Sequence, residues 1–191
     1  FLSSKDQPYV MEINKPVNII TSTNDAYIDL DTTSGSLMGD NPGNRFTISY
    51  GGSGTNMTGI KFHNTQLWIS NTSYVVFDHI SNVVEDQRVG SGVGATSVRD
   101  NSSYVTIKNS YFYTRNNGGS TTFTFSWANH CVFDNNTVKI EGNNVGNMLY
   151  LNLMNIANFP NVTVNAYGGK SPTCPVNTYN KFTNNRLYGK E

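Results

Sequence analysis

Val105-Thr106-Ile107-Lys108-Asn109 is one copy of a five-residue pattern that recurs along the chain and decides its fold. In each copy, mostly apolar residues of one face alternate with polar or variable residues, which is the period of a β-strand. The last residue is Asn or His, the types that best tolerate a left-handed turn. The other copies cover residues 60–64, 75–79, 131–135 and, more weakly, 180–184. Repetition of a strand and a tight turn predicts a solenoid of stacked coils.

Two further sets of short strands repeat within the same frame. One set covers residues 82–85, 112–115 and 138–141. The other covers residues 67–70, 96–99, 123–126 and 149–152, with residues 47–50 and 27–30 as the expected earlier copies. Three short strands per coil, repeating at 20 to 30 residues, predict an all-β parallel β-helix of about six coils. Signatures of propellers and leucine-rich repeats are absent.

Composition excludes several classes of function. The chain has 191 residues, 14% charged residues and a formal net charge of zero, so it has no basic surface for nucleic acid. No apolar run is long enough to span a bilayer, and we expect no membrane contact from this segment. The first residue is Phe, which suggests a mature or excised piece of an exported protein. The 12% of aromatic residues at regular positions indicate a packed fold despite 28 Asn residues.

The whole chain, residues 1–191, is expected to be one β-helix domain or a segment of a longer solenoid. Residues 1–20 are interpreted as an entry or cap segment with a first strand. Residues 34–44, 90–94 and 159–175 interrupt the repeat and are rich in Gly, Pro or Asn, which is typical of loops. The last of them is the longest and is expected to be a loop insertion.

Stacking the copies predicts columns of residues about 4.8 Å apart on neighbouring coils. Two outward columns alternate in charge, which favours ion pairs that fix the register over catalytic roles. They are Lys61, Asp78, Lys108, Asp134 and Thr183, and Glu85, Arg115 and Glu141. A turn column of side chains that can hydrogen-bond to one another contains Asn64, His79, Asn109, Asn135 and Asn184.

The residues that remain as candidates for ligand contact are few. Asp86 and Arg88, beside a Gly-rich stretch, could bind a ligand or form a polar bend. Trp68 and Tyr113 are the first aromatic candidates for stacking on sugar rings, within a larger set that includes Trp127, Tyr104, Tyr111, Tyr150 and Tyr188. No residue is assigned as catalytic, metal-binding or cofactor-binding, and His63 and His130 lack a second ligand at a suitable spacing.

Cysteines and glycosylation sequons bear on the compartment. Cys131 lies at an inward strand position, which favours a buried thiol, although a disulfide with Cys174 stays open. Candidate glycosylation sites are Asn56, Asn71, Asn101 and Asn161, whereas the sequon at Asn135 falls on the turn column, where we expect burial.

The residues from Thr58 to Thr65, the copies 104–110 and 133–137, and the stretch from Val84 to Thr96 resemble the right-handed parallel β-helix repeats of adhesin-like surface proteins from methanogenic archaea. The resemblance covers residues 45–190. It implies a pectate-lyase-like solenoid and an exported, cell-surface, multi-repeat protein. It carries over no catalytic residues.

Three functions stay open from the sequence. The first is a non-catalytic adhesin-like module that attaches to a polysaccharide, a cell-surface glycan or a partner cell. The second is a polysaccharide lyase or glycoside hydrolase, although the Asp-Asp, Gly-His-Gly and Arg-Ile-Lys motifs of polygalacturonase-like enzymes are missing. Asp78 and Asp134 are expected two coils apart, at about 9 to 10 Å, near the upper separation for an inverting carboxylate pair, but Lys108 between them would keep both ionised. The third is a structural filament or spike module that self-associates through the ends of the β-helix.

Overall fold

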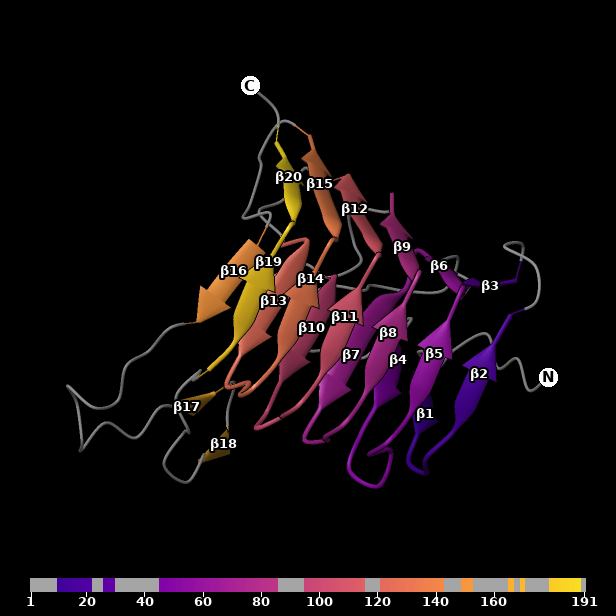
Figure 1. Ribbon diagram of the computed structural model, residues 1–191, viewed down its shortest axis with the longest axis vertical. Coiled ribbons are helices and arrows are strands. Elements are labelled where there is room, and N and C mark those ends of the chain that lie inside the picture. Colours follow the sequence, from indigo (N-terminus) through magenta and orange to yellow (C-terminus); the bar gives the residue numbers. More distant parts are fainter. Residues whose placement is uncertain are drawn as a thin grey trace.

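The chain folds into six coils of a parallel β-helix, as the computed structural model shows (Figure 1). The structure describes residues 10–21, 26–29, 45–85, 95–115, 121–142, 149–152, 165–166, 169–170 and 179–189. Within these residues there is no helix, and each coil contributes one short strand to each of three parallel sheets. The predicted all-β solenoid with about six coils and three strands per coil is therefore confirmed.

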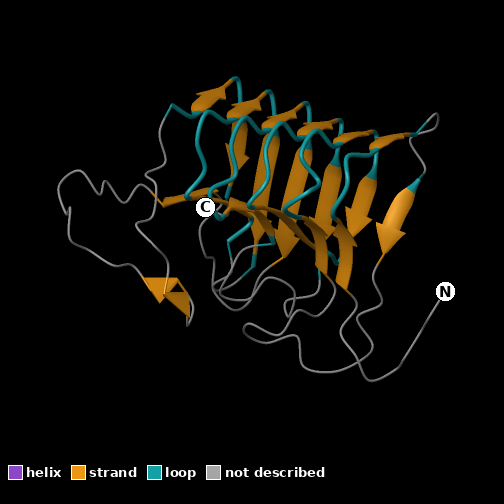
Figure 2. Cartoon of the chain, turned by 90° about the horizontal axis from the view of Figure 1, so that it is seen from below, coloured by secondary structure: helices purple, strands orange, loops and turns teal. Residues whose placement is uncertain are grey.

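The three sheets have six strands each and are called A, B and C in the order in which a coil visits them (Figure 2). Sheet A consists of β1 (Val10–Ile13), β4 (Arg45–Ile48), β7 (Gln66–Ser70), β10 (Thr96–Arg99), β13 (Phe123–Ser126) and β16 (Leu149–Asn152). Sheet B consists of β2 (Asn18–Ile20), β5 (Asn56–Thr58), β8 (Val76–Asp78), β11 (Thr106–Lys108), β14 (Val132–Asp134) and β19 (Lys181–Thr183). Sheet C consists of β3 (Tyr27–Asp29), β6 (Lys61–His63), β9 (Ser81–Val84), β12 (Tyr111–Arg115), β15 (Thr137–Glu141) and β20 (Arg186–Tyr188).

The predicted register holds through the central coils. Leu67 pairs with Thr96, Thr96 with Phe123, and Phe123 with Leu149, as the repeated strands of sheet A predicted. The second coil differs by one residue, because Phe46 and not Thr47 pairs with Leu67. The strand at Tyr27 was expected in sheet A, which is wrong, because Tyr27 pairs with Lys61 in sheet C.

One copy of the opening pattern was also assigned to the wrong sheet. Residues 61–63 form β6 in sheet C, and the strand that pairs with β8 is β5. Thr58 therefore takes the place of Lys61 in the first charge column. Gly59, with φ of 75°, takes the place of Asn64 in the turn column, and Asn64 lies at the next bend of the coil. The cause is that both strands of this coil have the same apolar alternation.

Two other segments refine the predicted organisation. Residues 10–20 supply the first strands of sheets A and B, so this part of the expected entry segment belongs to the first coil. Within the expected insertion 159–175, β17 (Asn165–Ala166) and β18 (Gly169–Lys170) form a short antiparallel pair. The other residues of that segment lie outside the described part of the chain.

The core is a column of buried aromatic and aliphatic side chains between the three sheets. Its largest fully buried side chains are Phe46, Phe62, Phe77, Phe112, Phe123, Phe125 and Phe133. Inward positions alternate with half-exposed outward positions along the strands of sheet B, for example in β8, where only Phe77 is buried. Because the core extends from coil to coil, it holds the bends between sheets at a constant spacing.

Candidate functional site

An exposed row of aromatic side chains follows the bend that links sheet A to sheet B, which we call the A–B bend. The row, called the aromatic column below, consists of Tyr74, Tyr104, His130 and Tyr179. All four residues have left-handed backbone conformations, with φ of 59°, 54°, 54° and 56°. Each lies three residues before an inward anchor of sheet B, so the coil repeat places them one above another.

Backbone hydrogen bonds fix the aromatic column in register. The Tyr74 N–H donates to the carbonyl of Ser103 at 3.1 Å, and the Tyr104 N–H donates to the carbonyl of Asn129 at 3.0 Å. The hydroxyls of Ser73 and Ser103 lie 2.8 Å apart, which adds a side-chain link beside the rings. The backbone that carries the rings is therefore part of the hydrogen-bonded ladder of the solenoid.

The four rings stack face to face along the coil axis. Successive ring centroids are 5.0, 4.9 and 4.9 Å apart, with interplanar angles of 6°, 20° and 27°. Exposure follows the order of the stack, because Tyr104 inside it is 46% exposed while the end rings of Tyr74 and Tyr179 are 62% and 81% exposed. The stack thus presents ring edges along its length and free ring faces at its ends.

The backbone strain of the aromatic column matters for its interpretation. A left-handed conformation costs an L-residue with a bulky side chain roughly 1–2 kcal/mol, whereas Gly and Asn adopt it more readily. Stacking of an aromatic pair returns about 0.5–1.5 kcal/mol. The two effects nearly cancel, so Asn or Gly would serve the fold equally well at Tyr74, Tyr104 and Tyr179.

The polar atoms of the aromatic column remain available to a ligand. No residue in the described part of the chain forms a hydrogen bond with the hydroxyls of Tyr74, Tyr104 or Tyr179. A tyrosine surface of this kind offers apolar area and a hydroxyl at little entropic cost, which is typical of recognition sites.

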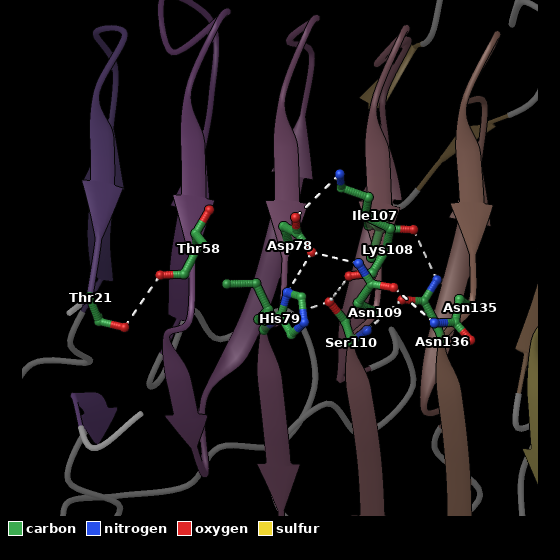
Figure 3. Close-up of polar contacts among 11 residues, drawn as sticks. Thr21, Thr58, Asp78, His79, Ile107, Lys108, Asn109, Ser110, Asn135 and Asn136 are labelled. Carbon is green, nitrogen blue, oxygen red and sulfur yellow. Dashed lines mark hydrogen bonds and ion pairs between the residues drawn. The ribbon is translucent and has the colours of Figure 1, made fainter. Parts of the chain in front are cut away.

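The next bend, from sheet B to sheet C, uses the same backbone conformation with polar side chains (Figure 3). His79, Asn109, Asn135 and Asn184 have φ between 52° and 56°, as the turn column predicted. The Asn135 amide donates to Asn109 at 2.8 Å, and the Asn109 amide donates to Asp78 at 2.9 Å. Hydrogen bonds within the chain therefore link the amides of this B–C bend from coil to coil.

A buried polar column lies directly beside these residues and was missed at the sequence level. Asn136 is fully buried, its amide donates to the carbonyl of Ile107 at 2.9 Å, and its oxygen accepts from the N–H of Ser110 at 2.9 Å. Asn185 repeats the arrangement one coil later with Phe133 and Asn136. Each Asn side chain thereby satisfies backbone groups that the bend would otherwise bury unpaired.

The carboxylates of sheet B are held in their ionised form. Burial acts to raise the pKa of Asp78, but hydrogen bonds from Asn109 and Lys108 outweigh it and place this pKa below its usual value. Hydrogen bonds from Thr183 and Asn184 lower the pKa of Asp134. Lys108 pairs in register with both and lies 3.2 Å from Asp78. Neither carboxyl has the raised pKa that a general acid needs.

The second charge column is in register, but its ion pairs differ from the prediction. Arg115 pairs with Glu141 along the backbone, as expected. The carboxylate of Glu141 instead forms its ion pair with Lys139 of its own strand, and that contact lowers its pKa. Glu85 lies 3.5 Å from the imidazole of His63.

Trp68 lies on the outer face of sheet A between two arginines. The guanidinium of Arg45 is 4.1 Å from the ring centroid, and that of Arg99 is 4.3 Å from it. These residues come from the strands on either side of β7, so they cover opposite faces of the indole. Trp68 therefore offers a ligand only its edge.

Tyr113 lies on the outer face of sheet C and is half-buried. Its hydroxyl donates to the carboxylate of Glu141 at 3.0 Å, and the ammonium of Lys139 is 5.7 Å from its ring. Burial and the hydrogen bond to Glu141 raise the pKa of Tyr113.

The remaining predicted residues are placed as follows. Asp86, Arg88, Asn161 and Cys174 lie outside the described residues. The sequon residues Asn56, Asn71 and Asn101 are exposed. Asn135 is exposed as well, contrary to the expected burial, because the buried position of the bend belongs to the residue after it.

Cys131 is a free, buried thiol, and burial raises its pKa to about 11. Its thiol contacts the carbonyl of Asn129 at 3.3 Å. This position agrees with the interpretation of Cys131 as a small apolar side chain.

The described residues contain no cluster of side chains suited to metal binding. In that part of the chain, no group of three or more His, Cys, Asp or Glu side chains could hold a metal ion. A search of the same residues found no helix that could cross a membrane. Comparison of the chain with protein-family models, curated proteins and solved structures found no match.

Sequence reasoning identified only one member of the aromatic column, Tyr104. A signal for the other three was present in the sequence, because Tyr74, His130 and Tyr179 each precede an inward aromatic residue of sheet B by three positions. The repeated pattern was aligned from residues 75, 105, 131 and 180 onward, so the residue just before each copy was not compared.

Proposed function

We propose that this chain is a non-catalytic, adhesin-like module of the cell surface that binds neutral glycan through the aromatic column. The observation that carries the proposal is the set of exposed, strained aromatic residues Tyr74, Tyr104, His130 and Tyr179. Strain that the fold does not require is concentrated at sites of function. The neighbouring B–C bend achieves the same geometry with Asn and His.

Neutral glycan fits this surface in size and chemistry. The centroid distances make the stack about 15 Å long, enough to contact several sugar residues. Ring faces and edges can pack on the C–H groups of a sugar, while the tyrosine hydroxyls bond to its hydroxyl groups. The stack itself contains no carboxylate or permanent cation, and the net charge of the chain is zero, which disfavours strongly charged ligands.

An adhesive role agrees better with the polar residues than an enzymatic role. The carboxylates of Asp78 and Asp134 are engaged in hydrogen bonds that lower their pKa values. The sequons at Asn71 and Asn101 are exposed, as they would be in an exported protein. The resemblance to archaeal adhesin-like β-helices supports the same proposal.

Binding to a panel of immobilised neutral polysaccharides tests this function. The variant Tyr74→Asn/Tyr104→Asn/Tyr179→Asn removes three rings and keeps a residue type that tolerates the left-handed conformation. We expect at least a tenfold loss of affinity, with unchanged circular dichroism. A matched control, Tyr27→Asn/Tyr111→Asn/Tyr188→Asn, removes three exposed tyrosines of sheet C, which are 66%, 37% and 49% exposed.

The control should bind like the unaltered protein. An equal loss in both variants, or no binding to any neutral polysaccharide, would contradict the proposal. Release of unsaturated or reducing sugars from the bound polysaccharide would instead establish the enzymatic alternative.

A further inference from the structure

The aromatic column continues past Tyr74 into two positions without an aromatic ring. Met57 pairs with Phe77 and Ile19 pairs with Met57, so the residues three positions earlier, Gly54 and Pro16, belong to the same column. The N–H of Gly54 donates to the carbonyl of Ser73 at 3.0 Å, and Gly54 has φ of 86°. Gly54 thus has the backbone role of Tyr74 but contributes no side chain.

The absence of a side chain at Gly54 leaves a gap of one ring in the stack. A Cβ built on Gly54 would lie 3.9 Å from the Cβ of Pro16 and would meet no other atom within 4 Å. Two coil steps of about 4.8 Å separate Pro16 from Tyr74, so the gap spans about 10 Å. The same span between Tyr74 and His130 is filled by the ring of Tyr104.

The gap has two apolar walls. Tyr74 is nearly parallel to Tyr104, at 6°, so one of its faces is covered and the other is turned toward Gly54. Tyr74 is accordingly more exposed than Tyr104, at 62% against 46%. The exposed ring of Pro16 forms the opposite wall. At the other end of the stack, no described residue faces Tyr179 in this way.

The rim of the gap is polar and carries amides. Asn56 begins the strand two residues after Gly54, and Asn18 pairs with it in the neighbouring coil. Both side chains are exposed. The amide of Asn56 reaches the carbonyl of Gly54 at 3.4 Å, a long contact that a better partner could replace. Primary amides donate and accept hydrogen bonds and so match the hydroxyl groups of a sugar, whereas an aromatic side chain would not use them.

We propose that one pyranose residue of a neutral glycan enters this gap, stacks on the free face of Tyr74 opposite Pro16, and bonds to the amides of Asn18 and Asn56. The ring of the sugar takes the place in the stack that Gly54 leaves vacant. This inference rests on the proposed glycan-binding function and names its specific subsite.

The variant Gly54→Tyr tests the subsite because it fills the gap with a ring from the chain itself. Gly54 has φ of 86°, beyond the 54° to 59° of Tyr74, Tyr104 and Tyr179, so the variant carries backbone strain, and circular dichroism checks that it folds. The probes are methyl glycosides of common neutral hexopyranoses and N-acetylhexosamines, followed by saturation-transfer NMR and by competition with immobilised polysaccharide. We expect at least a tenfold loss of binding in Gly54→Tyr.

Two further variants keep the test decisive if Gly54→Tyr does not fold. Tyr74→Asn removes one wall and Pro16→Ala the other, and each should weaken binding of the methyl glycosides at least tenfold. The control Tyr27→Asn removes a tyrosine of sheet C that lies outside the aromatic column and is about as exposed as Tyr74, so it should leave methyl glycoside binding unchanged.

The outcomes separate this inference from the proposed function. If polysaccharide binding is lost in the triple column variant but kept in Gly54→Tyr and in Tyr74→Asn, the subsite is overturned and the function stands. An equal loss in Tyr27→Asn also overturns the subsite. If the unaltered protein binds no neutral polysaccharide and no methyl glycoside, both proposals are overturned.

Discussion

The A–B and B–C bends solve the same backbone problem with different side chains. Both place a left-handed residue at the same position in successive coils. At the B–C bend, Asn109, Asn135 and His79 direct their polar atoms to each other and to Asp78. At the A–B bend, Tyr74 and Tyr104 stack and keep their hydroxyls in solvent.

The difference separates a bend that stabilises the solenoid from a bend that can bind. Amide donors that are already bound to side chains of the neighbouring coil, as in Asn109 and Asn135, are less available to a ligand. Aromatic rings held at a fixed spacing keep both apolar surface and hydroxyls available. Four experiments, from the largest expected effect to the smallest, test whether the two bends differ in this way.

The largest effect is expected on the inner side of the A–B bend, at Cys131. With Cys174→Ser, the second cysteine of the chain is removed and Cys131 can be followed alone. The raised pKa of about 11 keeps its thiol neutral at pH 8, so alkylation by iodoacetamide should be at least about a hundredfold slower than in urea.

The same pKa shift has a consequence for stability. Because the folded pKa of Cys131 lies above the unfolded value of about 8.5, the stabilising contribution is present below pH 8.5 and declines as pH rises toward 11. Rapid alkylation of the native protein at pH 8 would show that the A–B bend is open to water on both sides.

The second effect concerns the buried amide of the B–C bend. Asn136→Ala leaves the N–H of Ser110 and the carbonyl of Ile107 without partners, so we expect a loss of about 3 kcal/mol in the free energy of unfolding. Urea denaturation measures it. Asn135→Gly, at the exposed neighbour, keeps the left-handed conformation and should cost about 1 kcal/mol. Equal losses would remove the distinction between the two columns.

A smaller effect is expected for Asp78→Asn, which weakens the contacts with Lys108, His79 and Asn109. The free energy of unfolding at pH 7 should fall by about 1 kcal/mol, since these groups are partly exposed. The lowered pKa of Asp78 means that this contribution exists above its unfolded pKa of about 3.9 and is lost as pH falls through the folded value. The variant and the unaltered protein should therefore converge near pH 2. A difference that persists at that pH would point to packing instead of charge.

The smallest effect on stability is expected for Tyr104→Asn in the aromatic column. Relief of the strained conformation and loss of two ring contacts nearly cancel, so thermal unfolding should change by no more than about 1 kcal/mol. A loss of 3 kcal/mol or more would mean that the column is structural and would weaken the case for a binding surface.

The sequence predicted the strands best where apolar side chains repeat without ambiguity. The copies at Leu67, Thr96 and Phe123 gave the correct register of sheet A because only one alignment buries an apolar face in every coil. The copy at residues 60–64 was misplaced because it lies 15 residues before the next one. Three strands and three bends need about 20 residues, as the interval from Met57 to Phe77 shows.

The candidate site was less predictable, because exposure depends on neighbours from other coils. Trp68 and Tyr113 look alike in sequence as outward aromatic residues. Only the structure shows that Arg45 and Arg99 cover the ring of Trp68, and that Gly54 leaves a free place beside Tyr74.

The repeat pattern of the sequence was sufficient to predict the solenoid, its three strands per coil and the inward positions of its central coils, because period-two alternation and left-handed turn residues are local properties of the chain. The tertiary structure decided which side chains become neighbours across coils. Those contacts join residues 20 to 49 positions apart, and loops of unequal length set each interval. Stacked rings, paired charges and the gap beside Tyr74 therefore exist only once the coils are stacked.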